Sequence, residues 1–305
     1  MQFLLSKKGV TTVLVFVMLC IGMGAYVYIK KQASITQPTQ QEIVPEVIQE
    51  TVVTHERIGS SVEGRSIDAY TYGTGDTHLL FVGGIHGGYE WNSVLLSYKF
   101  MDYLEANPDV IPESLAITVI PSANPDGVYA VVGKEGRFTA IDVPTESTTA
   151  GLGRFNANDV DLNRNFDCKW KKESMWRGNV VDAGTNAFSE PEAVAIRDFV
   201  LTHKPQSVVF WHSQSNAVYA SECKKGILPE TLAIMNTYSK AAGYKAVDSF
   251  DAYEITGDAE GWLASIDIPA ITVELATHNV IQWEQNLAGI KALFTYYKPE
   301  TMLSR

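Results

Sequence analysis

Four residues that could support hydrolytic chemistry lie at the ends of short apolar runs. His86 and Glu90 follow one such run, His212 ends a second, and Glu274 lies in a third. Two imidazoles and one carboxylate are a familiar ligand set for a catalytic zinc ion, which needs three protein ligands and an open position for water. A further carboxylate that is not a ligand can take the proton of that water.

Each of these residues also has a plainer interpretation. A single histidine at a strand end is more often a hydrogen-bonded structural residue, and a glutamate in an apolar run can lie at the edge of its strand. Two such histidines together with Glu274 favour a shared site. The remaining histidines lack a comparable carboxylate context and are predicted to be structural: His55, His78, His203 and His278.

The elements that would position these residues alternate along the chain. Apolar runs bounded by glycine, proline or polar clusters predict buried strands at His78 to Val82, Leu115 to Ile120, Ser207 to Trp211 and Ala270 to Val273. Helical spacing predicts helices at Trp91 to Leu104, Glu190 to Leu201 behind a cap at Ser189, Pro229 to Ala242 and Trp283 to Tyr297. This alternation predicts a three-layer α/β/α fold with a central mixed, mostly parallel sheet and ligands at the carboxyl ends of its strands.

Two more segments are unusually polar. The segment 122–127 is a turn signal. The segment 156–166 contains Asn163 and Arg164, and such amide and guanidinium groups can clamp a carboxylate through paired hydrogen bonds. The alternative is an ordinary polar loop in which Asp161 balances the charge of Arg164. Arg154, just upstream, is a second cation that could face a scissile carbonyl.

In this order, the motifs resemble those of the zinc metallocarboxypeptidases of the carboxypeptidase A and B type, including the bacterial murein peptide amidases. The resemblance covers roughly Ile58 to the C-terminus. It is carried by His86 with Glu90, Asn124-Pro125-Asp126-Gly127, Asp161-Leu162-Asn163-Arg164-Asn165-Phe166, Ser189-Glu190-Pro191-Glu192, His212-Ser213, Tyr253 and Glu274.

The resemblance implies one Zn²⁺ per chain, held by His86, Glu90 and His212. The family usually has two residues between its first histidine and the glutamate, whereas three intervene here, Gly87-Gly88-Tyr89. A glycine bulge that absorbs the extra residue would keep Glu90 in the ligand set, because glycine permits the required backbone conformations. Without such a bulge, the metal would lose a ligand.

The resemblance also implies roles in catalysis and in substrate binding. Glu274 would be the general base and then the general acid, and Arg154 would polarise the carbonyl and stabilise the oxyanion. Asn163 and Arg164 would bind the terminal carboxylate of the substrate, and Tyr253 would close over it.

The segment 253–262 resembles the specificity segment of the family. It carries Asp258 and Glu260, and an acidic pocket would prefer a lysine, arginine or diaminopimelate side chain. Alternatively, both carboxylates are solvated at a helix start, where negative charge is favourable.

Cys168 and Cys223 both follow candidate site motifs. A disulfide between them is a hypothesis that depends on an oxidising compartment, and two buried free thiols are the alternative.

The N-terminal region predicts a membrane anchor. The 21 residues of Gly9 to Ile29 carry no charge, and as a helix they would span about 31 Å, close to the hydrocarbon thickness of a bilayer. A cleaved signal peptide is the alternative, in which case the protein would be secreted. We therefore predict an anchor at 1–31, a flexible linker at 32–52 and an extracytoplasmic catalytic domain at 53–305.

The composition argues against binding to nucleic acid, because 24 basic and 35 acidic residues give a net charge of -11. The sequence as a whole predicts a zinc carboxypeptidase that acts on peptides, cell-wall peptides among them. Two alternatives remain: an N-acyl amino acid deacylase of the related branch, and a zinc-free module that binds peptides in the same cleft.

Overall fold

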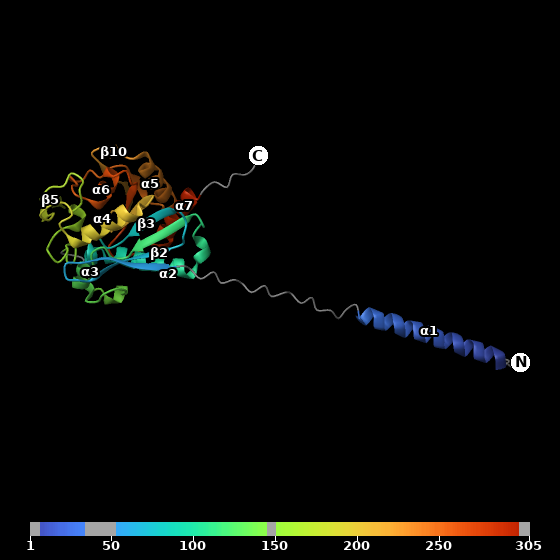
Figure 1. The fold of residues 1–305 in the computed structure, drawn as a ribbon. Coiled ribbons are helices and arrows are strands. Elements are labelled where there is room, and N and C mark those ends of the chain that lie inside the picture. Colours follow the sequence, from blue (N-terminus) through green and yellow to red (C-terminus); the bar gives the residue numbers. More distant parts are fainter. Residues whose placement is uncertain (1–6, 34–52, 145–150, 299–305) are drawn as a thin grey trace. The chain divides into compact units, whose positions relative to one another are not determined.

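The computed structural model describes residues 7–33, 53–144 and 151–298, and the chain divides into two units, Met1–Ile48 and Gln49–Arg305 (Figure 1). The first unit contains helix α1 (Lys7–Ala33). Within the described residues, no helix is long and apolar enough to cross a membrane, so the predicted transmembrane segment is not supported. The predicted linker lies outside the described residues from position 34 onward.

The second unit is built on a mixed sheet, in which the described residues form eight strands. From one edge to the other, these are β1 (Val53–Ser60), β2 (Ser66–Tyr72), β4 (Leu115–Ile120), β3 (Thr77–Val82), β7 (Ser207–Ser213), β12 (Ala270–Leu275), β8 (Ala217–Ala220) and β11 (Lys245–Val247). Neighbours from β4 to β12 run parallel, as do β8 and β11. The pairs β1–β2, β2–β4 and β12–β8 are antiparallel, so the predicted mixed, mostly parallel sheet is confirmed.

The central strands are buried on both faces. In β3, Leu79 and Phe81 join one hydrophobic cluster, whereas Leu80 and Val82 join the other, as expected for side chains that alternate along a strand. All residues of β7 are buried. These strands therefore appear in the sequence as continuous apolar runs, typical of parallel strands covered by helices.

Helices cover both faces of the sheet and form the outer layers (Figure 1). One cluster contains residues of α2 (Trp91–Ala106), α5 (Pro229–Ala242) and α7 (Trp283–Tyr297). The opposite cluster contains residues of α4 (Pro191–His203) and α6 (Ala259–Ser265). Helix α3 (Pro125–Val132) packs against the start of α2 in a third, smaller cluster.

The start of α4 differs from the prediction. Its N-cap is Glu190 and not Ser189, because Pro191 occupies the first helical turn, where its fixed φ is favourable. The Ser189 hydroxyl instead accepts a hydrogen bond from Asn165 Nδ2 at 2.9 Å and donates one to Glu190 Oε1 at 2.8 Å.

Short elements complete the unit. Two hairpins are formed by β5 (Glu173–Trp176) with β6 (Asn179–Asp182) and by β9 (Glu222–Cys223) with β10 (Gly226–Ile227). The 3₁₀ helices are η1 (Gly87–Glu90), η2 (Pro108–Val110), η3 (Ala140–Asp142) and η4 (Leu162–Arg164). Of these, η1, η4 and the β5–β6 hairpin contribute side chains to the site described next.

Candidate metal centre and active site

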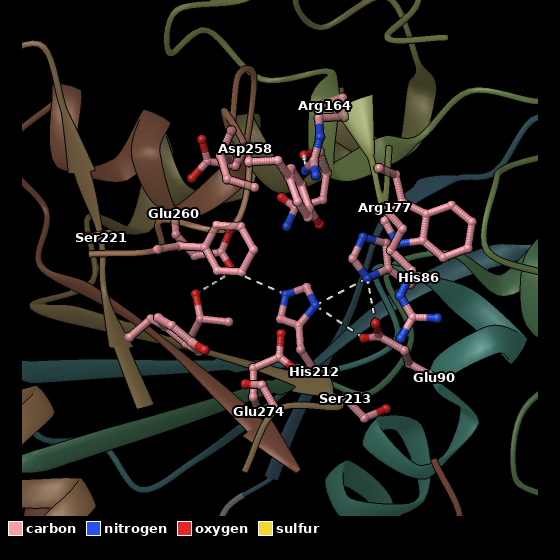
Figure 2. Close-up of a pocket in the computed structure, with 18 of the residues that line it drawn as sticks. His86, Glu90, Arg164, Arg177, His212, Ser213, Ser221, Asp258, Glu260 and Glu274 are labelled. Atoms are coloured by element: carbon pink, nitrogen blue, oxygen red, sulfur yellow. Dashed lines mark hydrogen bonds and ion pairs between the residues drawn. The ribbon is translucent and has the colours of Figure 1, made fainter. Parts of the chain in front are cut away.

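The predicted site residues gather at the carboxyl ends of three neighbouring parallel strands. His86 follows β3, His212 lies near the end of β7, and Glu274 lies near the end of β12. His212 and Glu274 are direct partners in the register of β7 and β12. Because these strands run parallel, the side chains that follow them lie at the same edge of the sheet (Figure 2).

A tight turn connects His86 to Glu90. Gly87 to Glu90 form η1, and α2 begins at Trp91. Gly87 has a φ of +46°, and a Cβ there would lie 2.5 Å from the Gly153 carbonyl oxygen, so a side chain is excluded both by conformation and by packing. The predicted glycine bulge is therefore a 3₁₀ turn instead, and it brings Glu90 back to His86.

His86, Glu90 and His212 converge on one point. Nδ1 of His86 lies 2.9 Å from Glu90 Oε1, Nδ1 of His212 lies 3.1 Å from Glu90 Oε2, and the two Nδ1 atoms lie 3.2 Å apart. One potential ligand atom from each residue lies within 4.8 Å of the others, and all three residues are buried. This is the donor set of a catalytic zinc site.

The second nitrogen of each imidazole faces another carboxylate. His212 Nε2 lies 3.1 Å from Glu260 Oε1, and His86 Nε2 lies 3.6 Å from Asp161 Oδ1. Metal-ligating histidines almost always direct their second N–H at a carboxylate, a carbonyl or water, which fixes the tautomer and the ring orientation. Glu90 Oε2 lies 3.1 Å from His212 Nδ1, but among the described residues it accepts no hydrogen bond of suitable geometry. The residues present therefore fit a zinc ion.

The acidic groups of the site differ in how readily they ionise. Burial by itself would raise the pKa of Glu90, but the charges of His86 and His212 outweigh burial and hold this pKa well below its usual value. Burial and the neighbouring Glu90 carboxylate raise the pKa of Glu274 to about 8. Glu274 Oε2 is buried without a hydrogen-bond partner among the described residues. A zinc ion held by His86, Glu90 and His212 would act against the shift of Glu274, because a nearby cation favours the ionised carboxylate.

Arg154 is fixed beside this cluster. Its Nε and Nη2 donate to Asp161 Oδ2 at 3.1 and 2.7 Å, and its Nη1 lies 4.0 Å from Glu90 Oε1. The guanidinium stacks on the Trp176 ring with its central carbon 4.3 Å from the ring centroid. This buried cation is preorganised, as a group that stabilises developing negative charge must be.

Asn163 and Arg164 lie on η4 and line the same pocket. Asn163 Oδ1 accepts from the Ala259 amide at 2.8 Å, and Arg164 donates to the Met175 carbonyl from Nε and Nη2 at 3.3 and 3.2 Å. The backbone amide of Asn163 donates to Asp161 at 3.1 Å. The loop interpretation, in which Asp161 merely balances Arg164, is therefore wrong, since Asp161 pairs with Arg154 and faces His86.

The remaining predicted residues line the pocket, which has a volume of about 410 Å³. Tyr253 lies in it with its ring 4.8 Å from that of Phe250. Asp258 is half-buried and caps α6, since its carboxylate accepts from the Gly261 amide at 2.7 Å. Glu260 is buried and also accepts from Thr272 Oγ1 at 3.0 Å, so the alternative of a solvated position is wrong for Glu260.

The pocket region contains residues that the sequence did not single out. The sequence favours Arg164 as the partner of Asp161, because Arg164 is the arginine nearer to Asp161 along the chain. His278 was predicted to be structural; its Nδ1 lies 2.8 Å from Ser213 Oγ, and its ring centroid lies 4.5 Å from that of Tyr89. Arg177 also lines the pocket. In the sequence, its only signal is the Arg177-Gly178 pair, which resembles a turn.

Cys168 and Cys223 form a disulfide, which connects the segment after η4 to β9. Replacing both cysteines with serine is expected to lower the free energy of unfolding by up to about 4 kcal/mol, because the bridge closes a loop with a sequence separation of 55 residues. Urea unfolding with and without a reductant measures this loss. Cys20→Ser is the control, since the Cys20 thiol is free. An unchanged midpoint in the double variant would contradict the stabilising role of the bridge.

Comparison with known proteins gives several curated relatives, among them two bacterial enzymes. The gamma-D-glutamyl-L-diamino acid endopeptidase 1 of Lysinibacillus sphaericus is 25% identical over 240 residues, which are 72% of this chain and 60% of that protein. Murein peptide amidase A of Escherichia coli (strain K12) is 30% identical over 181 residues, which are 56% of this chain and 66% of that protein. The chain thus spans about 60% of the length of the first of these relatives.

Solved structures share the fold. The murein-tripeptide amidase of Escherichia coli O157 has a TM-score of 0.56 at 23% identity and covers 79% of this chain and 90% of its own. Carboxypeptidase A from Helicoverpa armigera has a TM-score of 0.61 at 22% identity, and the alignment covers 81% of this chain and 70% of that chain. A family model described as zinc carboxypeptidase matches residues 48–302. Because this match covers well over half of the chain, the chain belongs to the zinc carboxypeptidase family.

Proposed function

We propose that the protein is a zinc-dependent carboxypeptidase that hydrolyses peptides with a free C-terminal carboxylate. The observation that carries the proposal is the convergence of His86, Glu90 and His212 in one pocket with Glu274 and Arg154. When bound, zinc supplies a Lewis acid and makes a water molecule more acidic. Family membership supports this chemistry.

The remaining steps belong to residues of the chain. Glu274 takes a proton from the attacking water and delivers it to the leaving amine, and its unpartnered Oε2 is available for both transfers. Arg154 stabilises the negative charge that develops on the carbonyl oxygen, and its bonds to Asp161 hold it in place.

Asn163 and Arg164 bind the terminal carboxylate of the substrate. The planar guanidinium group of arginine matches the geometry of a carboxylate. The Met175 carbonyl accepts hydrogen bonds from the Arg164 guanidinium and so fixes its orientation. Tyr253 lies against the same pocket and closes over the bound residue. These contacts hold the scissile bond near the reactive groups, which accelerates the reaction by positioning.

Cell-wall peptides are the proposed natural substrates, and the compartment is extracytoplasmic. Two relatives are named for murein peptides and for γ-D-glutamyl-L-diamino acid bonds. The disulfide between Cys168 and Cys223 supports the compartment, since structural disulfides persist in oxidising environments and are rare in the cytosol.

The test uses the purified chain. We expect about one zinc per chain, release of the C-terminal residue from peptides, loss of this activity after treatment with a chelator, and its return when zinc is added back. Activity on N-acyl amino acids but not on peptides would instead support the deacylase alternative. A folded chain that binds peptides, does not bind zinc and does not hydrolyse the peptides would instead support the alternative of a zinc-free peptide-binding module.

The pocket also predicts a preference for basic C-terminal residues, whose positive charge the Asp258 carboxylate would attract. Asp258→Asn keeps an efficient N-cap for α6 but removes the charge, so the KM for a C-terminal lysine or diaminopimelate residue should rise about tenfold more than the KM for leucine. Kinetics on the matched peptides measure this difference, with the exposed Asp251→Asn as control. Glu260→Gln is less informative, because Glu260 contacts His212. An equal rise for both kinds of peptide would refute a charge-reading pocket.

A further inference from the structure

Successive residues of strand β5 contact site residues or the segment 253–262. Ser174 Oγ lies 2.8 Å from Thr256 Oγ1, the Met175 carbonyl accepts from Arg164, and the Trp176 ring stacks on Arg154. Residue 177, next along the chain, donates from Nη1 to the Tyr89 hydroxyl at 3.1 Å. The strand therefore runs from the residue that binds the terminal carboxylate, past the residue that faces the scissile carbonyl, to Arg177.

Arg177 lies in a conformation that is unfavourable for arginine. Trp176 and Asn179 pair across the β5–β6 hairpin, so Arg177 and Gly178 form a two-residue loop, and both have positive φ, at +49° and +81°. Such loops favour asparagine or glycine at the first position, because a Cβ disfavours the left-handed region. Unfavourable backbone conformations of this kind cluster at functional sites.

The turn also directs Arg177 toward the pocket. Neighbouring side chains in a strand point to opposite faces, yet both Trp176 and Arg177 line the pocket, because Arg177 lies just beyond the end of β5. Among the described residues, Arg177 has no ion pair with a carboxylate, whereas Arg154 has Asp161. The hydrogen bond to the neutral Tyr89 hydroxyl leaves the charge of Arg177 uncompensated.

We infer that Arg177 binds a carboxylate on the acyl side of the scissile bond. The substrate class is thus a peptide whose cleaved bond follows an acidic residue, and the inference rests on the function proposed above. A guanidinium with open N–H groups at the rim of a cleft is suited to bidentate binding of a carboxylate. With Arg164 on the terminal carboxylate and Arg154 on the scissile carbonyl, Arg177 comes next on the acyl side.

A glutamyl residue at that position offers its free carboxylate in the same way in both of its possible linkages. A glutamyl residue places its free carboxyl carbon four C–C bonds, about 5 Å, from the scissile carbonyl carbon. That spacing is the same whether the α- or the γ-carboxyl group forms the peptide bond, so Arg177 serves either linkage.

The test compares peptides that differ only in glutamate or glutamine on the acyl side of the cleaved bond. We expect the full-length zinc-loaded protein to have a kcat/KM about 10- to 100-fold higher for the glutamate peptide, as hydrogen bonds to a charged group allow. Arg177→Asn should abolish this preference and leave the rate on the glutamine peptide within about twofold. Because asparagine suits the turn, its melting temperature should be maintained or raised.

A matched control separates this contact from general electrostatic attraction. Lys169 is an exposed cation that lines the pocket and also has a positive φ, of +52°. Lys169→Asn removes the same charge, and the preference for glutamate should remain. An unchanged preference in Arg177→Asn, or an equal loss in both variants, would overturn the inference while peptide hydrolysis persists. Absence of hydrolysis of either peptide by the wild-type protein would instead refute the proposed function.

Discussion

Glu274→Gln is expected to lower kcat about 10²- to 10⁴-fold while the protein retains its zinc. Glutamine occupies nearly the same volume but cannot accept a proton at neutral pH, so it removes general acid–base catalysis, whose contribution has this size. Glu274 is not one of the three residues of the candidate ligand set, so the metal content should not change. Steady-state kinetics with metal analysis of the same sample measure both quantities.

A second pocket glutamate supplies the control for this variant. Glu254 lines the same pocket but is exposed and forms an ion pair with Lys171 at 2.7 Å. Glu254→Gln removes one negative charge from the pocket at a position away from the strand ends, so kcat should remain within about twofold, as for most surface changes. Full activity of Glu274→Gln would exclude Glu274 as the general base, and loss of zinc from it would assign Glu274 to the metal instead.

The centre of the fold could be predicted because its signals are local. Strands β3, β4, β7 and β12 are buried on both faces and appear as apolar runs, and the predicted bounds differ from the observed ones by at most two residues. The edge of the sheet could not be predicted in this way. Most residues of β1 are exposed, so it has no apolar run, and β8 and β11 are too short to show a period.

The difference between local signals and non-local contacts also decides which site residues can be predicted from the sequence. His86, His212 and Glu274 are found from sequence because each follows or ends an apolar strand. The partner of a buried charge is a non-local property, however. Asp161 pairs with Arg154, seven residues away, rather than with Arg164, three residues away, and no local pattern distinguishes these pairings.

For Glu260, the sequence identifies a site residue but not the group that its side chain contacts. Its place in the specificity segment and its charge predict a residue that contacts substrate, but the fold turns it toward His212 and Thr272. Whether a side chain at the first turn of α6 faces the substrate or a metal ligand depends on how α6 packs against β12. Charge and sequence position therefore identify a candidate site more reliably than they identify the target of each side chain.

Glu90→Ala is expected to abolish both zinc retention and activity. A catalytic zinc needs three protein ligands, and this change removes the carboxylate whose two oxygens face His86 and His212. The preparation should fall from about one zinc per chain to a small fraction after dialysis, and peptide hydrolysis should fall with it. Since η1 is short and alanine fits its backbone, the circular dichroism spectrum should remain that of the folded protein.

This prediction also tests the unusual spacing between His86 and Glu90. If the 3₁₀ turn places Glu90 in the ligand set, high added zinc should restore part of the activity of Glu90→Ala, because the two imidazoles still provide a weak site. Unchanged zinc content would remove Glu90 from that set. Together, the two glutamate variants separate roles that a single loss of activity would confuse: Glu274→Gln is inactive with zinc bound, whereas Glu90→Ala is inactive because zinc is lost.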